Sequence, residues 1–144
     1  MRFAVILLLV GALASCNSSS APENEPAQSL SDSLLTEVLA GHDVAMPKMM
    51  KLERLQKEAQ NEADSLRKKG GANPARIKQL DSLVHTLSQA DGAMHAWMNG
   101  FKYDSLKDNE VQREAYLKGQ LAAVNKMKDL VVAGIQKADS VLAK

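Results

Sequence analysis

Apolar residues recur every three or four positions from Leu30 to the end of the chain, and no stretch alternates apolar and polar residues as strands do. Short polar segments divide this pattern into three long stretches. We expect helices over about 30–67, 74–100 and 108–142. Three long helices joined by short loops predict an all-α fold, an antiparallel up-down-up three-helix bundle with coiled-coil-like packing over residues 30–144.

Capping residues indicate where the helices begin and end. Ser29 or Ser31 is a suitable N-cap for the first helix, and Gly70-Gly71 follow its last turn. Asn73-Pro74 supply an N-cap and then a proline at the first helical position of the second helix. Asn99-Gly100 are typical of a helix end.

Pro47 interrupts the first apolar pattern. A proline inside a helix removes one backbone hydrogen bond and costs ~3 kcal/mol unless the chain bends around it. We expect the first helix to be kinked at Pro47. The alternative is a complete break at this residue, which would give four helices.

The first sixteen residues have the pattern of a lipoprotein signal. Arg2 precedes an apolar run from Phe3 to Val10, and the whole apolar region is too short to cross a bilayer as a stable helix. It ends in Leu13-Ala14-Ser15-Cys16, which resembles the bacterial lipobox, and Cys16 is the only cysteine in the chain. We therefore expect residues 1–15 to be a signal peptide, and Cys16 to carry a diacylglyceryl group and an acyl chain such as palmitate.

Residues 16–29 predict a flexible tether, because after Cys16 they are rich in Ser, Pro and Glu and lack large apolar side chains. Asn17 follows the lipidated cysteine and favours the outer membrane, with the protein facing the periplasm. Loss of Arg2 with the signal leaves 17 basic and 17 acidic residues, so the mature chain has no net charge. This balance excludes nucleic acid as an expected partner and leaves the membrane, reached through the lipid anchor.

Two segments concentrate methionine and aromatic residues: HDVAMPKMM at 42–50 and MHAWMNGF at 94–101. If the chain doubles back near Gly71, residues equidistant from that glycine face each other, and the two segments meet at one end of the bundle. The expected facing pairs are Met49 with Met94, Met46 with Trp97, and His42 with Phe101.

This juxtaposition has three interpretations. It can be a packed core cluster around Trp97 and Phe101, with methionine filling irregular gaps. It can be a Cu(I) site, because thioether and imidazole groups suit a soft metal in a compartment where thiolates are scarce. It can be a groove for a lipid tail, another small apolar ligand or a peptide helix. The candidate copper ligands are His42, Met46, Met49, Met94 and Met98. Haem is disfavoured as a cofactor, because the chain has no CxxCH motif and few aromatic residues.

The motifs HDVAMPKMMKL and ADGAMHAWMNGF, with EAYLKGQLAAVNKM in the third helix, resemble a set of small helical lipoproteins from Bacteroidetes. These proteins often carry the inherited label "viral A-type inclusion protein", which reflects coiled-coil similarity. The matching positions include His42, Asp43, Pro47, Asp91 and Trp97. The family has no established activity, so the resemblance implies the helical fold, the lipid anchor and the pairing of the two segments.

No motif of a known enzyme class is present, and no catalytic activity is expected. His42 and Asp43 are sequence neighbours on a helix and should point about 100° apart, which disfavours an orienting dyad. Asp91 lies on an apolar stripe, where an unpaired carboxylate is costly. We expect it to make a local polar contact beside Gly92 that bends the second helix, and a partner from the third helix, Tyr116 or Lys118, is the alternative. His95 lies off that stripe and is not expected to matter.

The loop RKKGGANPARIK gathers five basic residues. We interpret it as helix capping with a solvated surface, and contact with anionic headgroups or a cell-wall polymer is the alternative.

Overall fold

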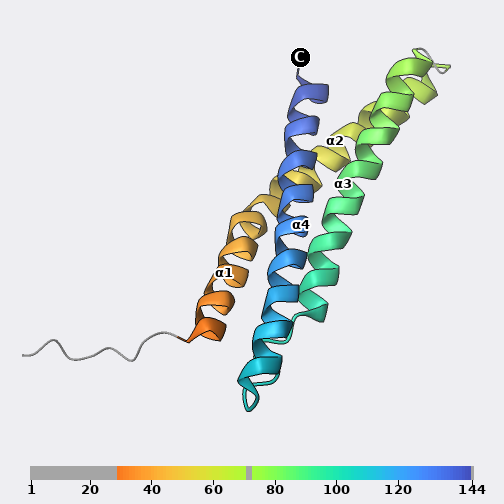
Figure 1. Ribbon diagram of the computed structural model, residues 1–144. Coiled ribbons are helices and arrows are strands. Elements are labelled where there is room, and N and C mark those ends of the chain that lie inside the picture. The colour runs from red at the N-terminus through yellow and green to blue at the C-terminus, as the bar shows by residue number, and fades with distance from the viewer. Residues whose placement is uncertain (1–28, 71–72, 144) are drawn as a thin grey trace, which may run out of the picture.

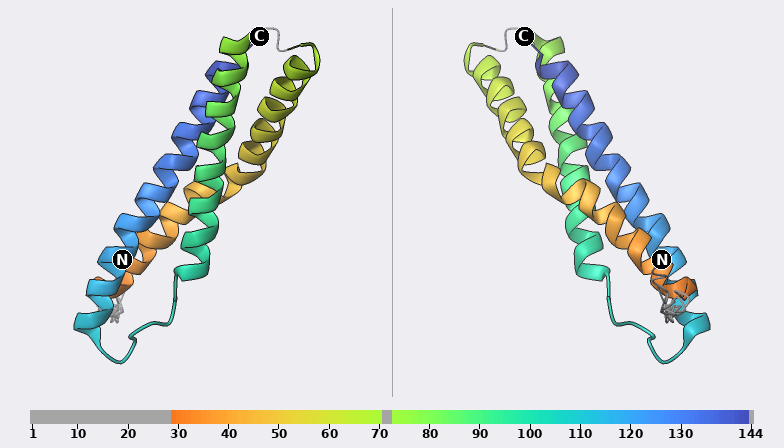
Figure 2. Two further views of the ribbon diagram at one scale, coloured as in Figure 1. Left: turned by 90° about the vertical axis from the view of Figure 1, so that its right-hand side faces the viewer. Right: turned by 90° about the vertical axis from the view of Figure 1, so that its left-hand side faces the viewer.

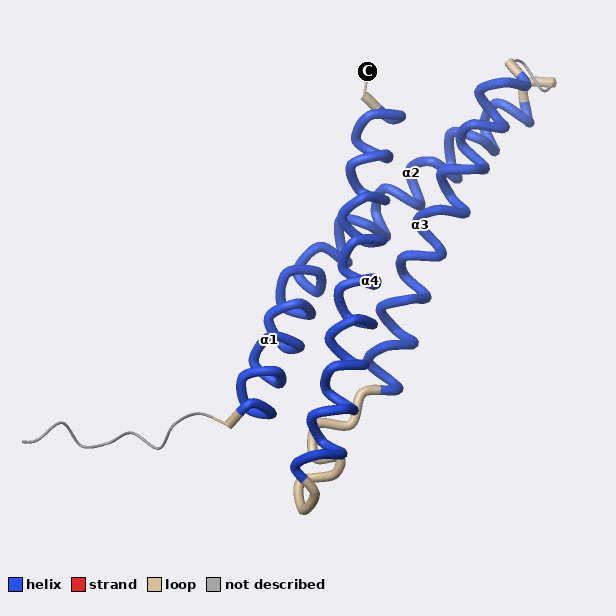
Figure 3. Tube along the Cα trace, in the orientation of Figure 1, coloured by secondary structure: helices blue, strands red, loops and turns tan. Residues whose placement is uncertain are grey.

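A computed structural model describes residues 29–70 and 73–143 of the chain. These residues form helices joined by turns, and none of them lies in a strand (Figure 3). The elements are α1 (Leu30–Ala45), a 3-10 turn η1 (Met46–Lys48), α2 (Met49–Lys68), α3 (Pro74–Gly100) and α4 (Glu110–Leu142). The predicted all-α fold is therefore confirmed for the described residues.

The helix ends match the capping signals in the sequence. Ser29 Oγ accepts a hydrogen bond from the backbone N–H of Asp32 at 3.1 Å, so Ser29 is the N-cap of α1. Asn73 caps α3 through the backbone N–H of Arg76, also at 3.1 Å, with Pro74 in the first turn. Gly70 follows α2 with φ +79°, a left-handed conformation that glycine adopts without strain.

Helix α4 is the common partner of the other elements (Figure 1). Helix α1 packs mainly against α4, whereas α2 packs mainly against α3, and α3 lies along α4. The start of α1 and the loop 101–109 lie at one end of the molecule, here called the tether end (Figures 1 and 2). The end of α2, the start of α3 and the last turn of α4 lie at the other, here called the hairpin end.

One continuous apolar core links α1, α2, α3 and α4. Its fully buried side chains are Val38, Leu52, Leu80, Leu83, Leu87, Met94, Val124 and Val131. A smaller cluster at the tether end joins the first turns of α1 to the first turns of α4, with Leu34 and Leu35 packed near Leu117. Phe101 contacts both clusters, so it connects the two parts of the core.

Among the described residues, none of the helices combines the length and the apolar character that a bilayer-crossing segment requires. The signal peptide, Cys16 and the tether up to residue 28 lie outside the described residues. These three expectations are therefore not addressed by the structure.

Candidate functional site

Four stacked rings from three helices form the most distinctive feature of the tether half, here called the ring ladder. The imidazole of His42 on α1 stacks on the indole of Trp97 on α3, with centroids 5.5 Å apart. Trp97 stacks on Phe101 at 4.9 Å, and Phe101 on Tyr116 of α4 at 6.4 Å. The ladder thereby connects α1, the end of α3 and the start of α4.

The ring ladder confirms that the two methionine- and aromatic-rich segments, 42–50 and 94–101, meet, but the residues that face each other differ from those expected. His42 contacts Trp97, one helical turn from the expected Phe101. A straight hairpin would pair the whole first segment with the second, whereas α1, which precedes the 3-10 turn, packs mainly against α4. Met49 and Met94, which were expected to face each other, do lie in the same buried core.

The five methionines of the two segments fall into two groups. Met49 and Met94 are buried, at 6% and 1% exposure, and are core residues. Met46 and Met98 are exposed at 43% and 41%, and Met50 at 84%. Of the candidate copper ligands, the two buried thioethers are thus enclosed by apolar neighbours, and His42, Met46 and Met98 have access to solvent.

His42 and Asp43 interact directly, which the expectation for sequence neighbours did not anticipate. His42 Nδ1 lies 3.0 Å from Asp43 Oδ1, with the imidazole mostly covered and the carboxylate mostly exposed. The two side chains leave the helix in different directions but are long enough to curl toward each other. The expectation that they cannot form an orienting pair was wrong. The contact occupies Nδ1 and leaves Nε2 as the other polar atom of this ring.

Asp91 does not contact either of the residues considered on α4. Its Oδ1 atom is buried without a hydrogen-bond partner, and His95 Nε2 lies 3.6 Å away, one turn along α3. Tyr116 accepts a hydrogen bond from the backbone N–H of Lys102 at 2.7 Å, and Lys118 pairs with Glu114. The alternative of a partner from α4 was therefore wrong, and the neighbour of the carboxylate is an i, i+4 residue on its own helix.

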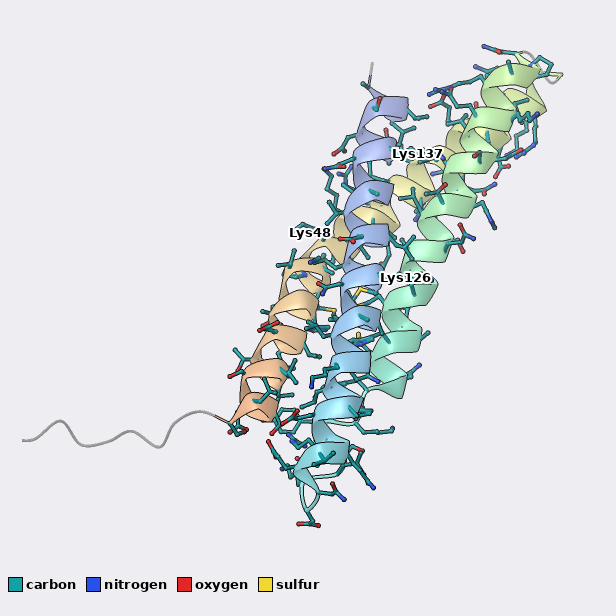
Figure 4. All side chains as sticks on the ribbon, viewed as in Figure 1. Lys48, Lys126 and Lys137 are labelled. Carbon is teal, nitrogen blue, oxygen red and sulfur yellow. The ribbon has the colours of Figure 1, made fainter. Side chains whose placement is uncertain are left out.

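The face between α3 and α4 next to the ring ladder carries a shallow groove of about 260 Å³. Its lining residues include Trp97, Lys126 and Leu130. Lys126 and Lys137 both extend from α4 on the side that faces α3 (Figure 4), and Lys137 Nζ donates to Thr86 Oγ1 at 3.1 Å. Trp97 Nε1 is buried without an acceptor in the structure.

Two arginines of the basic loop are engaged in ion pairs that close the hairpin end. Arg76 contacts Glu62 at 2.7 Å and donates to the carbonyl of Val141 at 2.9 Å. The hydrogen bond that Arg76 donates to Glu62 raises the pKa of Arg76. Arg67 bridges Asp64 and Asp81, and the hydrogen bond with Asp81 raises the pKa of Arg67.

These pairs join α2 to α3 and, through Val141, to α4, a role that the interpretation as helix capping with a solvated surface did not include. The cations left for an anionic surface are Lys68, Lys69 and Lys78, which are exposed.

Arg113 is a buried charged residue that was not singled out from the sequence. It is 5% exposed, and its Nη1 donates to the carbonyls of Ser105 at 2.8 Å and Tyr103 at 3.4 Å. A buried guanidinium of this kind fixes the path of the loop 101–109. Its position four residues before Leu117, on the buried stripe of α4, was the available signal.

The arrangement as a whole holds no cluster of three or more His, Cys, Asp or Glu side chains suited to a metal ion within residues 29–70 and 73–143. What it offers is a stacked aromatic column beside one imidazole, two accessible thioethers and a shallow apolar groove. No protein-family model, curated protein or solved structure matches the chain.

Proposed function

We propose that the protein is a lipid-anchored helical-bundle component of the cell envelope that acts by binding or scaffolding. The observation that carries this proposal is the sequence Leu13-Ala14-Ser15-Cys16, which follows an apolar signal run and contains the only cysteine of the chain. Acylation at Cys16 holds the protein at the membrane. The neighbouring Asn17 favours the outer membrane, with the bundle in the periplasm.

The proposed architecture is an up-down-up bundle whose first arm, α1 and α2, is kinked at Pro47. Support comes from the 3-10 turn at Met46–Lys48, since proline cannot donate the hydrogen bond that a continuous helix needs at this point. Membership in the small Bacteroidetes lipoproteins that the motifs resemble belongs to the same proposal.

A scaffolding role is supported by the shape of the bundle. Helix α4 has 33 residues and, at about 1.5 Å per residue, extends about 50 Å. A rod of this length on a short tether places its hairpin end well away from the membrane. Partners are then recognised by surface features such as the shallow groove beside Trp97, which suits a small apolar group or a helical peptide.

Metabolic labelling with an alkyne analogue of palmitate tests the anchor. We expect the wild-type protein to incorporate the label and to sediment with membranes, and Cys16→Ser to do neither. Ser20→Ala, a change in the tether that spares the lipobox, is the matched control and should behave as wild type. Wild-type protein that is unlabelled and free of membranes would refute the proposal.

A second candidate function, Cu(I) binding, is favoured by one observation. Asp43 holds Nδ1 of His42 at 3.0 Å, the arrangement in which a carboxylate orients an imidazole and leaves Nε2 for a metal. The exposed thioethers of Met46, one turn after His42, and Met98, next to Trp97, are the sulfur ligands that this hypothesis uses.

Anaerobic Cu(I) titration against a competing chelator tests this second hypothesis, with the emission of Trp97, the only tryptophan, as a local reporter. We expect near-stoichiometric binding and quenching in the wild type, both lost in Met46→Leu/Met98→Leu. Met50→Leu, at an exposed methionine that the site does not use, is the control. Equal and weak competition by all three proteins would eliminate copper.

A further inference from the structure

Exposed apolar side chains gather at the tether end of the bundle. Val111, in the first turn of α4, is 79% exposed, and Leu106 and Tyr103 in the loop 101–109 are also exposed. Leu30, the first residue of α1, is half exposed at the same end (Figures 1 and 2). A group of exposed apolar side chains on a loop and two helix starts marks a surface for an apolar partner.

The loop that carries this group is held in place by specific contacts. The buried Arg113 binds the carbonyls of Tyr103 and Ser105, and the hydroxyl of Tyr116 accepts from the N–H of Lys102. Leu106 has φ +60°, a conformation that L residues other than Asn and Asp rarely adopt. The fold therefore holds a leucine outward in an unfavourable backbone conformation.

The chain outside the described part indicates which partner this surface meets. Twelve residues separate Cys16 from Ser29, and the thirteen Cα–Cα steps between them, at about 3.6 Å each, reach at most about 47 Å. The tether enters the bundle at Ser29, beside the exposed group. The hairpin end lies about a further helix length of 50 Å away, beyond that reach. A bilayer that holds the lipid of Cys16 is thus within easy reach of the tether end alone.

We propose that Leu30, Tyr103, Leu106 and Val111 form a membrane-contact surface that inserts into the headgroup region of the bilayer carrying the anchor. This inference rests on the proposed lipid anchor. The loop 101–109 contains two lysines and two aspartates, Glu110 follows as the first residue of α4, and Lys107 pairs with Asp104. Their charges nearly cancel, so the surface suits neutral, zwitterionic headgroups, and the apolar side chains provide the attraction. The contact sets the bundle upright on the membrane.

Site-specific fluorescence in proteoliposomes tests the surface. Cys16 is thioether-linked in the lipidated full-length protein, so L106C or V111C introduces the only free thiol for an environment-sensitive NBD label. The vesicles contain phosphatidylethanolamine and phosphatidylcholine, with or without nitroxide-labelled lipid. M50C, at an exposed apolar residue far from the tether end, and K69C, at the hairpin end, are the controls.

We expect nitroxide lipid to quench the labels at 106 and 111 about threefold more than those at 50 and 69, at low and high ionic strength alike. Val111 is so exposed that V111C leaves the fold intact even if L106C disturbs the loop. Vesicle flotation separates the two proposals. Floating protein without this quenching overturns the contact surface and leaves the anchor standing, whereas protein that does not float overturns the anchor and the surface together.

A blue-shifted label at 106 or 111 that nitroxide lipid does not quench would show that protein, such as a second copy of the chain, covers the surface. That outcome also overturns the membrane contact.

Discussion

The hairpin end and the tether end of this bundle are built in different ways. At the hairpin end the helices approach closely through fully buried small side chains such as Ala59 and Ala63, and ion pairs of Arg67 and Arg76 close the rim. At the tether end the contacts are made by stacked rings and by a buried guanidinium. Regular helix packing suffices for the first, whereas the second depends on individual side-chain shapes and hydrogen bonds.

Most of the irregular features lie in the tether half or at its border. These are the 3-10 turn, the ring ladder, the left-handed Leu106, the buried Arg113, and the buried polar atoms of Asp91 and Trp97 that lack partners. The exception is the left-handed Asn73 at the hairpin end, whose side chain caps α3. Features that cost stability persist where the surrounding structure holds them, and they tend to occur at functional sites. By this criterion, a functional site is expected in the tether half.

Replacement of Trp97 tests the ring ladder and should have the largest effect. Trp97→Ala removes the ring between His42 and Phe101, and we expect unfolding to become easier by about 3 kcal/mol, close to the loss for Leu80→Ala at the hairpin end. Trp97→Phe keeps a stacked ring and removes an N–H that has no acceptor, so it should cost under about 1 kcal/mol. Urea denaturation followed by far-UV circular dichroism measures all three.

A loss below about 1 kcal/mol for Trp97→Ala, typical of surface sites, would mean that the ladder contributes little to the fold.

Arg113→Met separates loop order from helix packing. We expect a loss of about 2 kcal/mol, because charged hydrogen bonds to two loop carbonyls disappear. Amide hydrogen exchange should accelerate in residues 101–109 and stay unchanged in α2. Arg54→Met, at an exposed arginine with only a loose contact to Glu58, is the control and should change neither quantity. Equal rates of amide hydrogen exchange in residues 101–109 of the two variants would show that Arg113 does not hold the loop.

Glycine replacements compare the packing of α1 on α4 with that of α3 on α4. A Cβ at Gly41 would lie 3.0 Å from Val124 Cγ1, so Gly41→Ala should destabilise by about 1 kcal/mol. At Gly134 the nearest atom is Leu87 Cδ2 at 3.4 Å, and helix propensity should dominate, giving a gain of about 0.5 kcal/mol. Thermal and urea unfolding measure both changes.

Gly119→Ala, with no neighbour within 4 Å, gives the propensity effect alone. A gain at Gly41 as large as at Gly119 would contradict close contact between α1 and α4.

The pH dependence of stability due to Asp64, at the hairpin end, should be the smallest effect. The pKa of Asp64 is lowered by the hydrogen bond from Gln60 and, to a smaller extent, by the hydrogen bond and positive charge of Arg67. A lowered folded-state pKa adds stability that is complete above the ordinary carboxyl pKa of about 3.9 and disappears as the pH falls through the lowered value. Asp64→Asn should therefore lower Tm slightly at about pH 6, with the difference from wild type shrinking toward about pH 2. A Tm difference between Asp64→Asn and wild type that does not change with pH would exclude this contribution of Asp64 to stability.

Local features of the fold were predictable, and the pairing of distant helices was not. The caps at Ser29 and Asn73 act within one helical turn, so residue type and spacing were enough to identify them. The packing of α1 on α4 depends on how the helices are arranged in space, which periodicity does not encode. For the same reason His42 contacts Trp97 and not the expected Phe101.

Side-chain partners were the least predictable part of the candidate site. Asp91 has two chemically reasonable partners on α4 and one on its own helix, and only the backbone geometry decides among them. Arg113 was not singled out from the sequence, because arginine is usually a surface residue, although its place on the apolar stripe of α4 was visible.

The dependence of α1 on α4 has a consequence for the order of assembly. Helices α2 and α3 are neighbours in the chain and close only a short loop when they pair, so they can form a hairpin early. Helix α1 emerges first during synthesis but finds its principal surface on the last helix to be made. A chain cut short before α4 would leave its first helix undocked and its apolar stripe exposed, a species that quality-control proteases recognise.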